Sequence, residues 1–208
     1  LIRSVLTRNE RTRVTSHTAG NLVVVLPGTD RVKQVKLHSN GQQVGSLSID
    51  YKMEWNTRRR FLRVKASELK VLSLTNRPVV RLDFKADMNR APVSHWNVHG
   101  ESTELGRILR FKTDTRLSEL HLSTGGVRFR PGLEDVLELA IDDLDIDAKK
   151  GWREVLHQRR EQWRLKQLSA AIHDSPETAV RVLKDLDYKI TLPGSGHPPP
   201  RPEHLRRS

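Results

Sequence analysis

The sequence predicts an α+β fold, with an antiparallel β-meander in the N-terminal half followed by packed C-terminal helices. Between residues 21 and 84, apolar residues recur with a period of two, as in half-buried strands. From Leu133 onward they recur at helical spacing. Short turn segments separate the strands, and strands joined by short turns pair antiparallel.

In the N-terminal half, the chain opens with a possible short helix within residues 1–13. Strands are expected at residues 21–26, 32–37, 47–55, 61–66 and 77–84. Asn40-Gly41 favours a tight hairpin turn, because both residues tolerate positive φ. The segment 47–55 alternates most strictly, which predicts one buried and one wet face.

Three helices are expected in the C-terminal half, at residues 133–144, 152–171 and 176–186. Ser175 and Pro176 are typical of an N-cap and a first helical position. The third helix is predicted to turn four apolar residues inward: Ala179, Val180, Leu183 and Leu186. A last short strand is possible at residues 188–192.

The chain is expected to form one domain over residues 1–192, with a strand-rich half (1–112) and a helical half (113–192). Residues 193–208 are rich in Pro, Gly and basic residues and have little to bury, so we expect disorder there.

The positive charge is unevenly distributed along the chain. Residues 1–112 contain 21 Lys or Arg and 9 Asp or Glu, which accounts for the whole net charge of +12, whereas residues 113–208 contain 16 of each. A basic half attracts an acidic protein surface or a nucleic acid. Arg58, Arg59 and Arg60, with Arg63 nearby, form the expected contact at a hairpin tip beside Phe61.

Several classes of site and location are disfavoured. The absence of cysteine excludes a disulfide framework, a thiolate zinc site and a cysteine nucleophile. No apolar run approaches the roughly 20 residues of a membrane-spanning helix, and the N-terminus is too charged for a signal peptide. We therefore expect a cytoplasmic protein with no membrane association, no cofactor and no metal; the oligomeric state does not follow from the sequence.

The polar cluster His95, Asn97, His99 and Glu101 is the candidate for chemistry. In an extended segment these four residues project from one face. A His-x-His pair with a carboxylate can act as general acid and base, or as metal ligands. In the alternative interpretation, which we favour, His95 and Asn97 satisfy backbone groups near the core. A second acidic run, between Glu134 and Asp147, lacks calcium-loop spacing and is expected to be a solvated helix face.

Two segments resemble the ubiquitin-conjugating-enzyme-like (UBC/RWD) family. PVSHWNVHGE (92–101) is similar to the family's His-Pro-Asn segment, with Trp96 where the family has Pro. LHLSTGGVRFRPGLEDVLELAIDDL (120–144) is similar to the segment that leads into a later helix, and the resemblance spans about residues 21–165. The family's cysteine is absent, so the resemblance implies a non-catalytic relative that binds a partner.

The predicted function is therefore a non-enzymatic interaction module whose basic half binds an acidic protein or a nucleic acid. One alternative is a histidine-dependent nuclease of small toxin type built on His95, His99 and Glu101. A second is a DNA-binding regulator that uses the helices 152–171 and 176–186, although the helical half carries no net charge.

Overall fold

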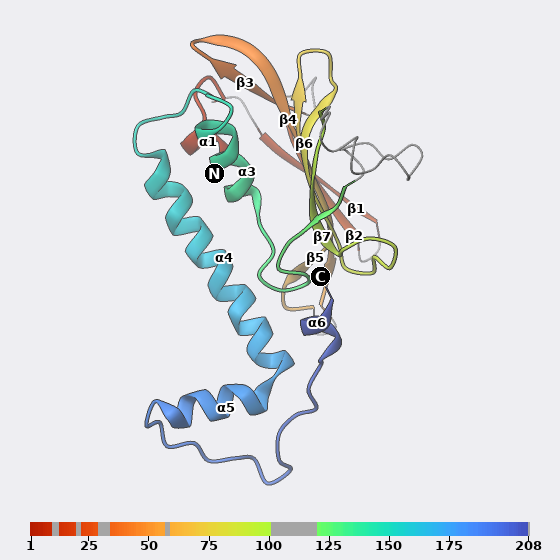
Figure 1. Cartoon of the computed structure of the whole chain (residues 1–208), viewed down its shortest axis with the longest axis vertical. Coiled ribbons are helices and arrows are strands. Elements are labelled where there is room, and N and C mark those ends of the chain that lie inside the picture. The colour runs from red at the N-terminus through yellow and green to blue at the C-terminus, as the bar shows by residue number, and fades with distance from the viewer. Residues whose placement is uncertain (10–12, 20–21, 29–33, 57–58, 101–119, 208) are drawn as a thin grey trace, which may run out of the picture.

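The computed structural model describes residues 1–9, 13–19, 22–28, 34–56, 59–100 and 120–207. These residues form a single antiparallel sheet, most of it from the N-terminal half, and the longer helices follow it in the chain (Figure 1). This architecture confirms the predicted α+β fold. Among the described residues, no helix is both long and apolar enough to cross a membrane.

The described strands all belong to this sheet, in the order β1-β2-β4-β5-β6-β7-β8, with β3 paired to β4 outside that path. Their bounds are β1 (Arg13–Ala19), β2 (Leu22–Gly28), β3 (Val35–Ser39), β4 (Gln42–Trp55), β5 (Leu62–Ser73), β6 (Pro78–Lys85), β7 (Ser94–Val98) and β8 (Leu122–Ser123). The sequence did not predict β1, β7 or β8 as strands, although it allowed for an extended conformation at residues 95–101.

The three helices predicted in the C-terminal half begin where expected. Their last residues differ from the predicted ones by one to three positions, as helix boundaries often do. The described helices are α1 (Ile2–Val5), α3 (Leu133–Asp142), α4 (Trp152–Asp174), α5 (Pro176–Asp185) and α6 (Glu203–Arg206). The N-terminal helix covers only four residues, after which Leu6 bridges to Ala148. Residues 188–192, where a last strand was possible, contain none.

The core lies between one face of the sheet and the helices α1, α3 and the first half of α4. Alternate residues of β3 to β6 enter it, and α3 contributes its buried stripe of Val136, Leu137 and Ala140. Leu156 of α4 is fully buried in the same cluster. The apolar faces that the strand and helix patterns predicted therefore pack against each other in this core.

The β3–β4 hairpin turns at Asn40 and Gly41, which have φ values of 49° and 78°. Positive φ at both central residues is the geometry predicted from the Asn-Gly pair. The carboxylate of Asp147 accepts hydrogen bonds from the Asn40 N–H (2.9 Å) and the Gly41 N–H (2.8 Å). A residue of the acidic run therefore fixes the turn.

Helix α5 begins at the predicted position, but its environment differs from the prediction. Ser175 is the N-cap residue, yet its hydroxyl bonds the Thr178 hydroxyl (2.9 Å) and makes no capping bond to the backbone. None of the ten residues of α5 is buried, and the predicted inward residues Leu183 and Leu186 are exposed. The prediction was wrong because α5 extends beyond the edge of the sheet, where no core is available (Figure 1).

The sequence led us to expect disorder over residues 193–208, and the structure describes residues 193–207 of this C-terminal segment. It contains α6, and it contacts the body of the protein at two places. His204 lies beside Asp174, and the Arg207 guanidinium donates to the backbone carbonyls of Ala86 and Met88. Composition alone gave no indication of these contacts, because each depends on a partner far away in the sequence.

Candidate functional site

The sheet face opposite the helices carries two neighbouring rows of polar side chains. Antiparallel register aligns Asp50, Glu68, Asp83 and His95 across β4 to β7. The second row lies two residues away along each strand and consists of Ser48, Lys70, Arg81 and Asn97. Because side chains alternate between faces, each row lies on the face away from the core. An acidic row thus lies beside a basic one.

Ion pairs link these two rows. Lys70 lies 2.5 Å from Glu68, and Arg81 lies 2.8 Å from Asp83. Arg81 also donates to the Asn97 side-chain oxygen at 3.1 Å. Burial raises the pKa of Asp83, and the neighbouring Arg81 guanidinium only partly offsets that effect. The charges on this face largely neutralise one another within the sheet.

His95 occupies the end of the acidic row and is only 2% exposed. Its Nδ1 atom lies 2.8 Å from the Pro92 carbonyl, and its Nε2 atom lies 3.5 Å from the Asp83 carboxylate. The ring also packs edge-on against His121, with ring centroids 4.6 Å apart. Both nitrogens therefore have internal neighbours, which leaves neither directed at a bound substrate.

Asn97 and His99 have different surroundings. Asn97 is fully buried, and its amide donates to the Leu120 carbonyl at 3.0 Å, which ties β7 to the following segment. His99 is partly exposed, but its Nε2 atom is buried and has no hydrogen-bond partner among the residues that the structure describes. Burial, together with the nearby Arg81 charge, lowers the pKa of His99. A neutral imidazole is the form that this environment favours.

The four residues of the predicted cluster are thus only partly brought together. His95 and Asn97 share one face of β7, as an extended segment requires. Glu101 lies outside the described residues. Asp83 and Arg81, which contact this cluster, were missed by the sequence analysis. The alternation of Arg81 and Asp83 with the apolar residues of β6 was the available indication that both point to this face.

The basic candidate site lies at the tip of the β4–β5 hairpin. The Asn56 side-chain oxygen accepts hydrogen bonds from the N–H groups of Arg60 (2.7 Å) and Phe61 (3.3 Å). The Asn56 N–H donates to the Phe61 carbonyl at 3.0 Å, which closes the loop. Asn56 therefore holds the described part of the tip in one conformation. Arg58 lies outside the described residues.

The described residues of this loop expose aromatic and basic side chains next to one another. Trp55 before the loop is 39% exposed and Phe61 after it is 59% exposed. Arg59 and Arg60 are exposed between them. Arg63, the fourth predicted contact, lies 2.7 Å from Glu54 and is therefore partly neutralised. We define the hairpin tip as Trp55, Asn56, Arg59, Arg60 and Phe61.

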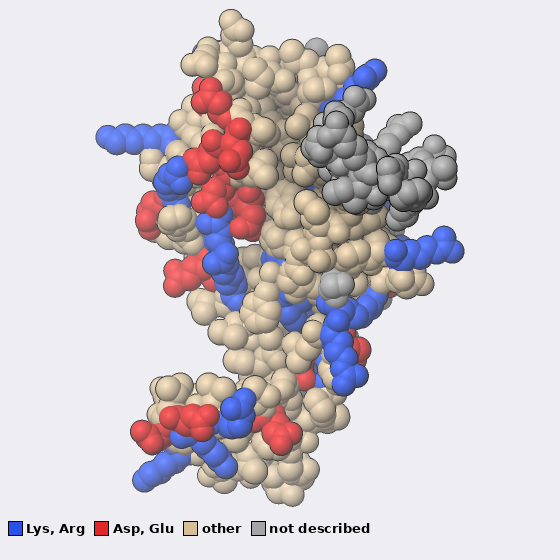
Figure 2. Space-filling model, viewed as in Figure 1, with Lys and Arg blue, Asp and Glu red and all other residues tan. Residues whose placement is uncertain are grey.

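The acidic run is used mainly for internal contacts and not as a free solvated face. Figure 2 shows acidic side chains gathered over α3. Asp135 and Glu138 of α3 hold Arg160 of α4, at 3.0 and 2.5 Å, and Asp142 holds Arg153 at 2.6 Å. The described residues contain no group of three or more acidic, His or Cys side chains placed to bind a metal ion.

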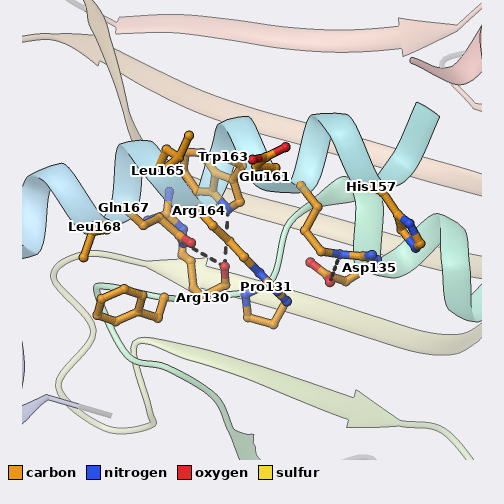
Figure 3. Close-up of a pocket in the computed structure, with 12 residues that line it drawn as sticks. Arg130, Pro131, Asp135, His157, Glu161, Trp163, Arg164, Leu165, Gln167 and Leu168 are labelled. Carbon is orange, nitrogen blue, oxygen red and sulfur yellow. Dashed lines mark hydrogen bonds and ion pairs between the residues drawn. The ribbon is translucent and has the colours of Figure 1, made fainter. Parts of the chain in front are cut away.

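A groove of about 630 Å³ lies between α4 and the segment that precedes α3 (Figure 3). Its polar groups are largely occupied: the Arg130 carbonyl accepts from Trp163 Nε1 (3.3 Å) and Gln167 Nε2 (2.8 Å), and Arg160 pairs with Asp135. The Arg130 guanidinium lies 3.7 Å from the centre of the Phe84 ring and 4.9 Å from that of Trp163. These contacts fasten α4 to the sheet.

The chain matches no protein-family model, no curated protein and no solved structure. What the site can do must therefore be inferred from its own residues.

Proposed function

We propose that this chain is a non-enzymatic binding module whose basic N-terminal half docks an acidic partner through the hairpin tip. The observation that carries this proposal is the exposure of Arg59 and Arg60 between two exposed aromatic side chains, on a loop held by Asn56. Elsewhere on the strand-rich half, Lys70 and Arg81 of the polar face are paired with carboxylates. The tip differs from that face in presenting exposed guanidinium groups beside exposed aromatic rings.

The composition of the tip favours a single-stranded nucleic acid as the partner. Arginine side chains bind phosphate, and exposed Trp and Phe rings provide stacking surfaces for unpaired bases. An acidic protein would use the arginines but would gain less from the two flat aromatic faces. The net charge of +12 in residues 1–112 adds long-range attraction for either partner.

The burial of His95 supports a binding role over the nuclease alternative. General acid–base catalysis requires a group within hydrogen-bond reach of the substrate. His95 is almost completely buried, with Pro92 and Asp83 beside its two nitrogens. The resemblance to non-catalytic UBC/RWD relatives remains a prediction, and it is compatible with this role.

Binding of a fluorescein-labelled single-stranded oligonucleotide, followed by anisotropy at low salt, tests where the partner docks. The double variant Arg59→Glu/Arg60→Glu should abolish measurable binding. Phe61→Ala should weaken it by about 1–3 kcal/mol, the contribution of one stacked base. Arg164→Glu/Lys166→Glu on α4 makes the same change of net charge elsewhere and should have a smaller effect. Equal losses in both double variants would contradict a contact at the tip.

A further inference from the structure

A third row of side chains crosses the sheet face opposite the helices, at the end that borders the hairpin tip. Lys52 of β4 pairs with Ala66 of β5, and Ala66 pairs with Lys85 of β6. On each strand the row lies two residues beyond the acidic row, so its side chains project from the same face. Two lysines therefore flank a small alanine across three neighbouring strands.

An irregularity in the pairing of β4 with β5 adds Lys65 to this row. The register shifts between Lys52 and Met53, which leaves Lys65 as an extra residue in β5. The Lys65 amine lies 4.0 Å from a carboxylate oxygen of Glu54. Glu54 shares a face with Lys52 because one residue separates them in the strand. We define the lysine row as Lys52, Lys65 and Lys85.

The cations of the lysine row are more exposed than those of the other two rows. Lys52 is exposed, and the side chains of Lys65 and Lys85 are 48% and 54% exposed. The ion pair of Lys85 with Asp87 is 3.8 Å long, whereas the pairs that link the other rows measure 2.5 and 2.8 Å. Exposed pairs of this kind are weak. These lysines can therefore exchange a carboxylate for a phosphate.

Arg63 connects the lysine row to the hairpin tip. It pairs with Glu54 across the two strands, its side chain is 62% exposed, and its guanidinium lies 2.7 Å from the Glu54 carboxylate. Arg63 and Lys65 thus share one carboxylate. At about 3.3 Å per strand residue, Lys52 lies about 10 Å from Trp55, where the tip begins. Single-strand binding sites cover about 4–16 nucleotides in OB folds, so one short strand can span both surfaces.

The acidic row limits where a nucleic acid lies on this face. Its carboxylates on β4 to β6 stand two residues from the lysine row, on the side away from the tip. The nearby cations Lys70 and Arg81 are held by these carboxylates. Since carboxylates repel phosphates, a phosphate chain is favoured only at the end of the face that borders the tip.

We propose that a single-stranded nucleic acid docked at the hairpin tip continues along the lysine row, with its phosphates over Lys52, Lys65 and Lys85. This inference rests on the proposed function and specifies the path of the ligand. The strand spacing of about 4.8 Å separates Lys52 from Lys85 by about 10 Å. The small side chain of Ala66 leaves room for the nucleic-acid backbone between them.

Alkylation of a single introduced thiol tests this path. Because the chain contains no cysteine, Ala66→Cys provides one thiol in the middle of the lysine row. An oligothymidylate of about 12 nucleotides, at about 100 times its Kd, should slow the reaction of this thiol with iodoacetamide by at least about tenfold. Ser169→Cys, at an exposed position of α4, is the control and should react at the same rate with and without the oligonucleotide.

Anisotropy titrations of the full chain give a second measurement. Lys52→Gln/Lys85→Gln should weaken binding of the same oligonucleotide by about tenfold at low salt and flatten the slope of log K against log salt by about two phosphate contacts. Arg164→Gln/Lys166→Gln on α4 removes the same charge and should have a smaller effect. Circular dichroism establishes that each variant folds.

The outcomes separate the path from the proposed function. An Ala66→Cys chain that binds the oligonucleotide but reacts equally fast with and without it would overturn the path and leave the contact at the tip standing. A Lys52→Gln/Lys85→Gln chain that binds as tightly as its control would overturn the path equally. A parent chain that binds no oligonucleotide at low salt would overturn the path together with the proposed function.

Discussion

The Nδ1 atom of His204 lies 3.0 Å from the carboxylate of Asp174, which is fully buried at the C-terminal end of α4. Arg128 donates to the other carboxylate oxygen at 2.7 Å, and the Arg201 N–H donates to the Asp174 carbonyl at 2.8 Å. The buried Asp174 thus contacts both the C-terminal segment and the loop before α3, at the end of α4. The composition of residues 193–208 predicts none of this order.

We expect a chain that ends at Leu192 to be less stable than the full chain. Removing His204 and Arg201 takes two neighbours away from Asp174, and a lost partner for a buried polar group costs about 1–3 kcal/mol. Urea unfolding of the truncated and full-length chains measures the difference. His204→Ala should reproduce part of the loss, and His197→Ala in the same segment serves as its control. Equal stabilities would instead support the expectation of a dispensable tail.

The stability of the protein should also depend on Asp174 at acid pH. Burial alone would raise the pKa of Asp174, but hydrogen bonds from Arg128 and His204 outweigh it and hold the pKa below its usual value. A carboxyl group whose pKa is depressed by folding stabilises the protein above the unfolded pKa, about 3.9. That contribution is lost as the pH falls through the folded-state pKa.

Asp174→Asn removes this ionisation and leaves a similar shape. We expect the variant to be less stable than the parent by about 1–3 kcal/mol between about pH 5 and 7. The difference should shrink as the pH falls below about 4. Asp187→Asn, at an exposed position, is the control and should follow the parent. A difference that stays constant down to about pH 2 would show that ionised Asp174 does not stabilise the fold.

His95 and His99 should respond differently to replacement by alanine. His95→Ala removes a buried ring from between Pro92 and Asp83, so we expect a loss of about 1–3 kcal/mol in the free energy of unfolding. His99→Ala should cost less, because His99 is partly exposed. Neither the parent nor the variants should cleave RNA or DNA, with or without divalent metal. Cleavage by the parent that is lost in a folded His99→Ala chain would establish the nuclease alternative.

The elements that the sequence predicted best are those whose pattern is local. The alternation in β4 and the apolar stripe in α3 could be predicted because each segment packs against the core with one face only. The Asn40-Gly41 turn could be predicted because these two residues favour the positive φ values of its geometry. The inward face predicted for α5 followed the same reasoning. It was wrong because periodicity reveals an apolar stripe but not whether the same chain covers it.

The candidate site could be predicted only in part, because register decides which residues meet. His95 and Asn97 were found from their alternation within one strand. Their neighbours Asp83 and Arg81 come from β6, and only the pairing of β6 with β7 brings them together. The contact of His204 with Asp174 could not be predicted for a similar reason, since the two residues lie far apart in the sequence.

The salt dependence of oligonucleotide binding tests the central claim, a basic module that docks an acidic nucleic acid, most directly. Binding through phosphates releases counterions, so log K should fall linearly with log salt, with a slope of about −0.7 per phosphate contact for a single strand. We predict a steep slope for the parent chain and a slope flatter by about one to two contacts for Arg59→Gln/Arg60→Gln. Absence of binding at low salt to single-stranded or duplex DNA and RNA would contradict the claim.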